Sequence, residues 1–364
     1  MIGWACLLLG VAVAVWGITG LRAWRRGIPA ELSAAGYASP TEADAELDAL
    51  QRTYPECCRI EEIGRSGEGR PIRVLRIGGE SMRGRSGRAM LLVTGHIHGV
   101  EYVGAHVARA VARRLVEEYG RDQKVTDLLD RAEVVVAPLL NPDAAARIWQ
   151  RGGWTSIRGA RYNARAVDLN RNFPVVPMPS AKGGRAWNSA RARPGSLFYA
   201  GPHPLSEPEC SALAQLCWRE RFRAAVNFHS FGCVVYMPQA PSGSAAQRAL
   251  DVFDGPFQSH QQRRYRAVRE RANAIRGQLD PFLLAAFGTA SVTVEVSQPP
   301  WSLLRPGRFG NMFWVWNPLD PEHWAGNDVD ATIQALLAQL DATDAQIISP
   351  TNPGLYEAPE ARPA

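Results

Sequence analysis

Lysine is nearly absent from this chain of 364 residues, in which Lys124 and Lys182 are the two lysines among 41 basic residues. The formal net charge is +6, but the arginines that produce it are scattered along the sequence. Proteins that bind nucleic acids usually concentrate basic residues on one face or along one helix. The charge therefore indicates an arginine-rich surface and predicts no nucleic-acid partner.

Cysteine is also scarce, since the chain has six and one of them, Cys6, lies in an apolar N-terminal stretch. Among the other five, Cys57 and Cys58 are adjacent, while Cys210 and Cys217 are seven residues apart on a predicted helix. An odd number with such spacings argues against a disulfide framework and against a cysteine zinc ribbon. We expect these thiols to pack in the core.

Charged side chains are absent from residues 1–21, and a helix of that length spans about 30 Å, the thickness of a bilayer core. A cleaved signal peptide is the main alternative, but the stretch lacks the basic start and the small-residue cleavage site of such peptides. Arg22, Arg25 and Arg26 follow directly. The positive-inside rule then predicts a single-pass membrane protein with the domain that follows in the cytoplasm.

The remaining chain is predicted to form a linker at 22–38, one domain at 39–345 and a loose, proline-rich tail at 346–364. Hydrophobic periodicity and end signals predict helices and strands in alternation. The predicted helices are 39–52, 102–118, 207–220 and 261–276, and the predicted strands are 58–63, 71–77, 89–94, 133–138, 224–228 and 291–296. This alternation predicts an α/β fold, with a mixed, mostly parallel twisted sheet flanked by helices.

His98 and Glu101 lie three residues apart, just after the predicted strand 89–94. A catalytic zinc commonly takes three protein ligands, and two histidines with one glutamate form one such set. His229, at the end of another predicted strand, is the best candidate for the third ligand. The first pair alone is a weak signal, because a solvated strand end explains it equally well.

Glu295 interrupts the predicted strand 291–296, where a lone carboxylate is costly to bury without a metal or a proton nearby. Its position favours a catalytic role. The polar block at 167–174 strengthens the case for an active site, since it fits neither a core segment nor an ordinary turn.

Together these blocks resemble the zinc carboxypeptidase family, M14, and most closely its bacterial murein-peptide amidase branch. The resemblance covers roughly residues 55–300. The blocks that carry it are His98-Gly99-Val100-Glu101, Asn141-Pro142-Asp143, Arg161-Tyr162-Asn163-Ala164, Asp168-Leu169-Asn170-Arg171-Asn172-Phe173, His229-Ser230 and Glu295. It implies a carboxypeptidase-like α/β sandwich and a zinc-dependent enzyme that hydrolyses an amide bond next to a free terminal carboxylate.

The resemblance also implies a role for individual residues. His98, Glu101 and His229 would hold one zinc ion per chain. Glu295 would be the general base that activates the zinc-bound water, and Arg161 would stabilise the oxyanion.

The polar block at 167–174 carries the remaining roles. Asn170 and Arg171 would grip the substrate's terminal carboxylate, which a guanidinium can bind through two hydrogen bonds. Asp168 would orient the first histidine by a hydrogen bond, although an aspartate that only caps its loop is the plainer alternative.

The sequence departs from the family where side-chain specificity is set. Counting back from Gly277 to the place of the family's mobile tyrosine reaches Ala272 and Asn273, and Tyr265 lies too early, so this role stays unassigned. Asp280 could face a basic substrate side chain, but a structural role is favoured. No substrate side chain is predicted.

Two other functions remain open. An N-acyl amino-acid deacylase of the succinylglutamate desuccinylase type shares the histidine–glutamate spacing and the later histidine, and Asn170 and Arg171 fit it as well. An inactive, zinc-binding adaptor is the third possibility, against which Glu295 and Arg161 argue. The expected partners are a peptide or peptide-like substrate with a free carboxylate and, through residues 1–21, a membrane.

Overall fold

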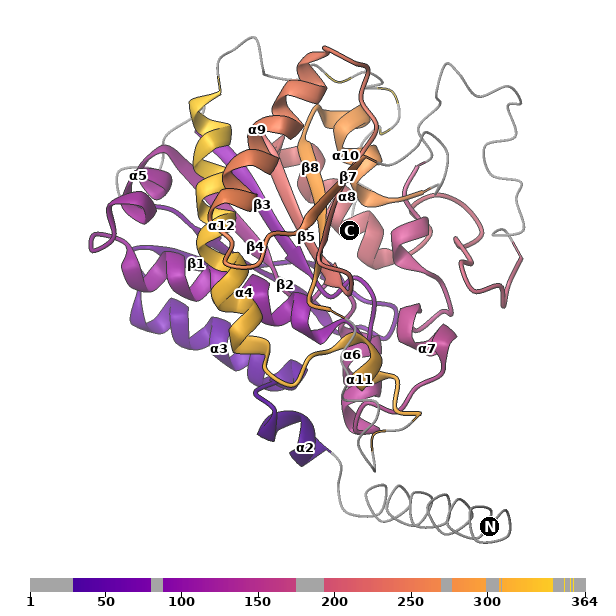
Figure 1. Ribbon diagram of the computed structural model, residues 1–364. Coiled ribbons are helices and arrows are strands. Elements are labelled where there is room, and N and C mark those ends of the chain that lie inside the picture. Colours follow the sequence, from indigo (N-terminus) through magenta and orange to yellow (C-terminus); the bar gives the residue numbers. More distant parts are fainter. Residues whose placement is uncertain are drawn as a thin grey trace, which may run out of the picture.

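One mixed eight-stranded sheet forms the centre of the molecule (Figure 1). The computed structural model describes residues 29–79, 88–174, 193–269, 277–298 and 310–342, together with residues 308, 350, 354 and 356. The strands are β1 (Cys58–Arg65), β2 (Pro71–Ile77), β3 (Ala89–Gly95), β4 (Ala132–Ala137), β5 (Ala224–Ser230), β6 (Val234–Met237), β7 (Arg266–Arg269) and β8 (Ala290–Val296).

The strand order is β1-β2-β4-β3-β5-β8-β6-β7. The four central strands β4, β3, β5 and β8 run parallel. Antiparallel pairs lie on both sides of this centre, where β2 pairs with β1 and β4, and β6 pairs with β8. The predicted mixed, mostly parallel sheet is therefore confirmed.

Helices cover both faces of the sheet because its central strands are apolar on both sides. Leu91 and Val93 of β3 pack into one hydrophobic cluster, and the alternate residues Met90 and Leu92 pack into another. The first face carries α3 (Pro40–Thr53), α4 (Tyr102–Glu118), α5 (Gln123–Arg131), α9 (Ala245–Ser259) and α12 (Pro321–Asp341); the second carries α8 (Pro208–Glu220) and α10 (Leu279–Phe287) (Figure 1). The predicted α/β sandwich is thus observed.

The start of α3 shows how local sequence sets these elements. Ser39 Oγ accepts a hydrogen bond from the backbone N–H of Glu42 at 3.1 Å, and a Glu42 carboxylate oxygen accepts one from Ser39 N–H at 2.7 Å. This reciprocal capping satisfies two backbone donors that a helix end leaves unpaired, and Pro40 suits the first helical position. The helix therefore begins where the sequence predicts.

Tertiary packing forms structure before α3 that the local sequence pattern does not predict. Residues 29–34 of the predicted linker form the short helix α2 (Pro29–Ala34), in which Leu32 is fully buried. The Tyr37 hydroxyl then donates to Pro318 O at 2.7 Å. The end of this segment therefore belongs to the folded domain.

The predicted helix at 261–276 is wrong over residues 261–269, because residues 266–269 form strand β7 and pair with β6. Hydrogen bonding to an available sheet edge outweighs the helical pattern there. Residues 270–276, which include the two positions considered for the family's tyrosine, lie outside the described residues.

The two ends of the chain are described only in part. The predicted anchor at 1–21 and most of the predicted tail at 346–364 lie outside the described residues. In the described part of the chain, no helix is both long enough and apolar enough to cross a bilayer. Tyr356 of the tail is buried and its ring packs edge-on against Phe282 and Phe287, so the tail is not loose at that residue.

Candidate metal centre

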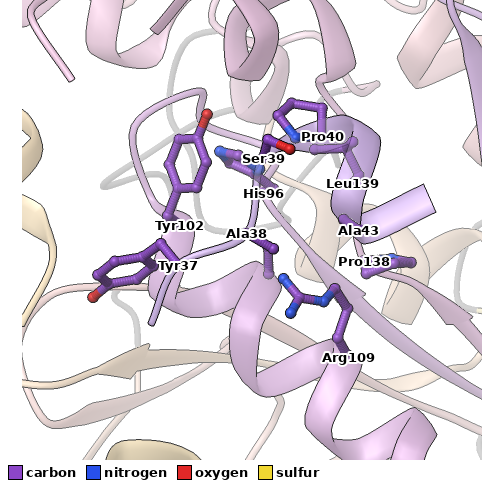
Figure 2. Close-up of a pocket in the computed structure, with 11 residues that line it drawn as sticks. Tyr37, Ala38, Ser39, Pro40, Ala43, His96, Tyr102, Arg109, Pro138 and Leu139 are labelled. Atoms are coloured by element: carbon purple, nitrogen blue, oxygen red, sulfur yellow. The ribbon is translucent and has the colours of Figure 1, made fainter. Parts of the chain in front are cut away.

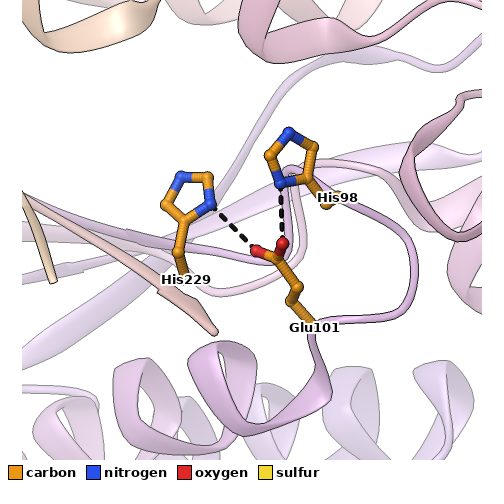
Figure 3. Close-up of side chains that lie close together, drawn as sticks. All are labelled: His98, Glu101 and His229. Atoms are coloured by element: carbon orange, nitrogen blue, oxygen red, sulfur yellow. Dashed lines mark hydrogen bonds and ion pairs between the residues drawn. The ribbon is translucent and has the colours of Figure 1, made fainter. Parts of the chain in front are cut away.

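Three buried side chains converge near the carboxyl ends of β3 and β5. His98 and Glu101 follow β3, and His229 is the penultimate residue of β5. The Glu101 carboxylate lies between the two imidazole rings, 2.8 Å from His98 Nδ1 and 2.9 Å from His229 Nδ1 (Figure 3). The structure therefore brings the three predicted ligands together.

This group fits a zinc ion by its chemistry and by its geometry. One ligand atom from each of the three residues can be chosen so that all lie within 4.8 Å of one another. Two imidazoles and one carboxylate are a common donor set for catalytic zinc. Burial by itself would raise the pKa of Glu101, but His98 and His229 hold it well below its usual range, so the carboxylate stays available as a ligand.

Asp168 lies on the far side of the His98 ring from Glu101. Its Oδ1 is 3.2 Å from His98 Nε2, and a hydrogen on Nε2 that donates to this oxygen leaves the Nδ1 lone pair for a metal. Asp168 is fully buried, which would raise its pKa, but Arg161, Arg171 and His98 keep the pKa well below its usual value. The geometry suits the predicted orienting role.

Arg161 reaches the same carboxylate from the end of the short helix α7 (Ile157–Arg161). Its Nε donates to Asp168 Oδ2 at 3.0 Å, and its Nη2 lies 3.0 Å from His98 Nε2. The chain folds back between them because Asn163 Oδ1 accepts from Val167 N–H at 3.1 Å. This turn places the predicted oxyanion-stabilising arginine beside the metal centre.

Glu295 lies on β8, directly across the parallel β5–β8 pair from His229. Its side chain is half-buried, and its charge is one of the influences that raise the pKa of Arg161 against the effect of burial. The sheet register therefore places the predicted general base next to a predicted metal ligand.

The two predicted carboxylate-binding residues lie in the one-turn helix η2 (Leu169–Arg171), and both are buried. Asn170 Oδ1 accepts from Leu279 N–H at 3.0 Å, which ties this turn to the start of α10. Since a substrate carboxylate needs hydrogen-bond donors, the amide nitrogen is the end of Asn170 that suits it.

Phe198 is a feature of the site that the sequence did not reveal. The centroid of its ring lies 5.2 Å from Arg161 Cζ and 5.4 Å from Arg171 Cζ, and the residue is 37% exposed. The sequence pattern singles out no aromatic residue in this part of the chain. Phe198 lies 27 positions after Arg171, so only the folded chain shows the contact.

The structure accounts for two residues whose roles the sequence left open, Tyr265 and Asp280. Tyr265 is buried and its hydroxyl donates to Asp328 Oδ2 at 2.9 Å, which does not fit a mobile catalytic tyrosine. Asp280 is buried and accepts hydrogen bonds from Asn227, Ser291 and Thr293. The structural role favoured for Asp280 is therefore what its contacts support.

A small pocket lies beside the loop that carries the metal ligands, between α3 and α4 (Figure 2). Tyr37, Ser39, His96 and Arg109 line part of it. Its space is on the scale of a single water molecule, too little for a substrate side chain. His96, in the loop after β3, donates from Nε2 to Gly99 O at 2.8 Å.

Comparison with known proteins decides the family. The zinc carboxypeptidase family, M14, matches residues 43–300. The chain belongs to this family. As expected for a zinc carboxypeptidase, the cofactor is zinc, and the group of His98, Glu101 and His229 can hold it.

Several carboxypeptidases are similar in sequence over part of their length. Carboxypeptidase A6 of Mus musculus is 29% identical over 56% of this chain and 45% of its own, and carboxypeptidase A5 of Homo sapiens is 31% identical over 61% and 49%. The inactive metallocarboxypeptidase ECM14 of Saccharomyces cerevisiae is 26% identical over 56% and 47%. The chain spans about half the length of the curated relatives it matches.

Solved carboxypeptidase structures show the same fold. Carboxypeptidase A from Helicoverpa armigera has a TM-score of 0.64 and 22% identity, covering 84% of this chain and 73% of its own. A metallo-carboxypeptidase from Burkholderia cenocepacia has a TM-score of 0.56 and 20% identity, covering 82% and 68%. The predicted family and fold are therefore confirmed.

Proposed function

We propose that the protein is a zinc metallocarboxypeptidase, which hydrolyses the amide bond next to a free terminal carboxylate. The observation that carries the proposal is the grouping of a zinc-binding triad with Glu295 and Arg161 at one end of the sheet. An acid–base carboxylate and a fixed cation beside a metal centre are the parts that amide hydrolysis requires.

Each side chain has a distinct task in this reaction. His98, Glu101 and His229 would hold the zinc ion, which would supply a Lewis acid that polarises the scissile carbonyl and lowers the pKa of water. Glu295 takes a proton from the attacking water and returns it to the leaving nitrogen. Arg161 stabilises the negative charge that develops on the carbonyl oxygen, while Asp168 holds both Arg161 and His98 in place.

Recognition of the substrate's end rests on Asn170 and Arg171. Both are buried in the turn that follows Asp168, so their side chains have little rotational freedom to lose on binding. A guanidinium can hold a carboxylate through two parallel hydrogen bonds, which favours a chain end over an internal peptide bond. We therefore propose exopeptidase activity.

Activity on four kinds of substrate tests this function. Peptides with a free C-terminus should be shortened by one residue, and the same peptides with a terminal amide should be poor substrates. Exclusive cleavage of N-acyl amino acids would instead identify a deacylase, and no hydrolysis by the zinc-loaded protein would identify an inactive member of the family. Murein peptides belong in the set because of the resemblance to the murein-peptide amidase branch.

The proposed location is the membrane, with residues 1–21 as a single-pass anchor and the domain in the cytoplasm. The uncharged stretch and the three arginines that follow it support this placement. A reporter fused after Ala364 distinguishes the two sides, since alkaline phosphatase activity without cytoplasmic fluorescence would place the enzyme outside.

A further inference from the structure

We propose that Phe198 is a positioning residue that holds the guanidinium groups of Arg161 and Arg171 in their working orientations. The inference rests on the proposed function of these two arginines. Phe198 takes no part in the chemical step of this reaction, because a phenyl ring neither transfers a proton nor binds a metal.

The ring contacts both arginines at the distance of a cation–π interaction. Both guanidinium carbons lie within 5.4 Å of its centroid, inside the limit of about 6 Å at which the ring's negative face attracts a cation. One aromatic ring thus contacts two positive charges that come from different segments, α7 and η2.

The backbone around Phe198 is fixed to the catalytic segment itself. Tyr199 O accepts a hydrogen bond from Asp168 N–H at 2.8 Å, and Ala200 O accepts one from Asn172 Nδ2 at 2.8 Å. The ring therefore moves with the segment that carries Asp168 and Arg171. This attachment distinguishes Phe198 from an aromatic side chain that covers the site by chance.

A phenyl ring suits this position better than an acidic side chain would. A carboxylate would occupy the guanidinium N–H donors and neutralise the charge that the substrate carboxylate and the oxyanion need. A ring attracts the cation through its face and accepts no strong hydrogen bond, so it orients the arginines without occupying any of their N–H donors.

The first test replaces the ring and keeps most of its volume. F198L should lower kcat/KM by about 5- to 30-fold, the combined effect of two cation–π contacts at partly exposed sites. We expect KM to rise because Arg171 is less well oriented, and kcat to fall because Arg161 is less well oriented. The ratio of kcat/KM for free and amidated C-termini should decrease. F198W should restore activity, because indole is the stronger cation–π partner.

Trp218 provides a matched control. It is 40% exposed and its ring faces Arg221 at 5.6 Å, but it lies on α8, outside the proposed machinery. W218L should leave both kinetic constants unchanged. Equal loss in F198L and F198W, or none in F198L, would overturn the proposal.

A second test separates charge from shape even if F198L folds poorly. Incorporation of phenylalanines with one, two and three ring fluorines at position 198 progressively weakens the negative face with little change in size. The expected result is a stepwise fall in kcat/KM at constant zinc content, and a flat series would refute the Phe198 proposal. If R171A in the parent enzyme leaves the preference for a free carboxylate intact, the proposed function fails instead.

Discussion

Asp168 accepts hydrogen bonds from His98 and Arg161 on different carboxylate oxygens, at 3.2 Å and 3.0 Å. One fully buried carboxylate therefore links a metal ligand to the arginine proposed to stabilise the oxyanion. Both contacts favour its negative charge, and Arg161, Arg171 and His98 hold the pKa of this carboxyl well below its usual range.

D168N should weaken zinc binding and slow turnover together. The amide keeps the shape of the side chain but removes the charge, and loss of such an orienting carboxylate typically costs about 10- to 100-fold in metal affinity or activity. Competition with a chelator measures the zinc affinity. A variant with unchanged affinity would show that Asp168 only caps its loop.

E295Q should bind zinc normally and lose most of its turnover. The carboxamide fits the same space across from His229 but cannot accept the water's proton, and a positioned general base contributes roughly 10²-fold or more. Zinc content and kcat should be measured on the same preparation. Wild-type kcat in E295Q would assign the base to another residue.

R171A and N170A should impair substrates with a free terminal carboxylate far more than amidated ones. The pair is proposed to bind that anion, so its loss removes the discrimination between the two forms. The ratio of kcat/KM for free and amidated peptides is the measurement. R158A, which removes a nearby exposed arginine, is the control and should keep the wild-type ratio. Equal cleavage of free and amidated peptides by the parent enzyme would contradict exopeptidase recognition.

The stability of the domain should depend on Asp328, away from the active site. Burial raises the pKa of Asp328 from 3.8 to about 7, although Gln261, Asn327 and Tyr265 donate hydrogen bonds to it. The folded state then holds a proton that the unfolded chain releases, so the free energy of unfolding should fall as pH rises from about 4 to 7 and level off above that.

The variant D328N isolates this contribution. Urea unfolding of the wild type and D328N at pH 5, 6, 7 and 8 gives the difference in free energy of unfolding at each pH. The wild type should lose stability relative to D328N between pH 5 and 7. A difference that stays constant with pH would mean that Asp328 has the same pKa in the folded and unfolded chain.

The metal ligands near strand ends could be predicted from the sequence, because a few neighbouring residues show both where a strand ends and which side chain can bind a metal. His98, Glu101 and His229 follow or end apolar runs, and parallel strands bring their carboxyl ends to one edge. The contact of Phe198 with two arginines is of another kind. It depends on how residues 193–200 pack against the site, far along the chain from Arg161 and Arg171, which no local pattern encodes.

The errors in the predicted secondary structure also arise from contacts between distant parts of the chain. Strand β7 replaced part of a predicted helix because the edge of β6 was available for hydrogen bonding. Helix α2 formed inside a predicted linker because Leu32 found a buried site. In both cases a distant part of the chain determined the local structure, as tertiary contacts commonly do.

The zinc content of H229A is the most direct test of the proposed metal centre. His229 lies in β5, whereas His98 and Glu101 follow β3, so its loss removes one ligand and leaves the other two on their own segment. H203A, which removes an exposed histidine, is the control. After dialysis against zinc and then zinc-free buffer, the wild type and H203A should retain one zinc ion per chain and H229A close to none. Near-wild-type zinc in H229A would contradict the assignment of the metal centre.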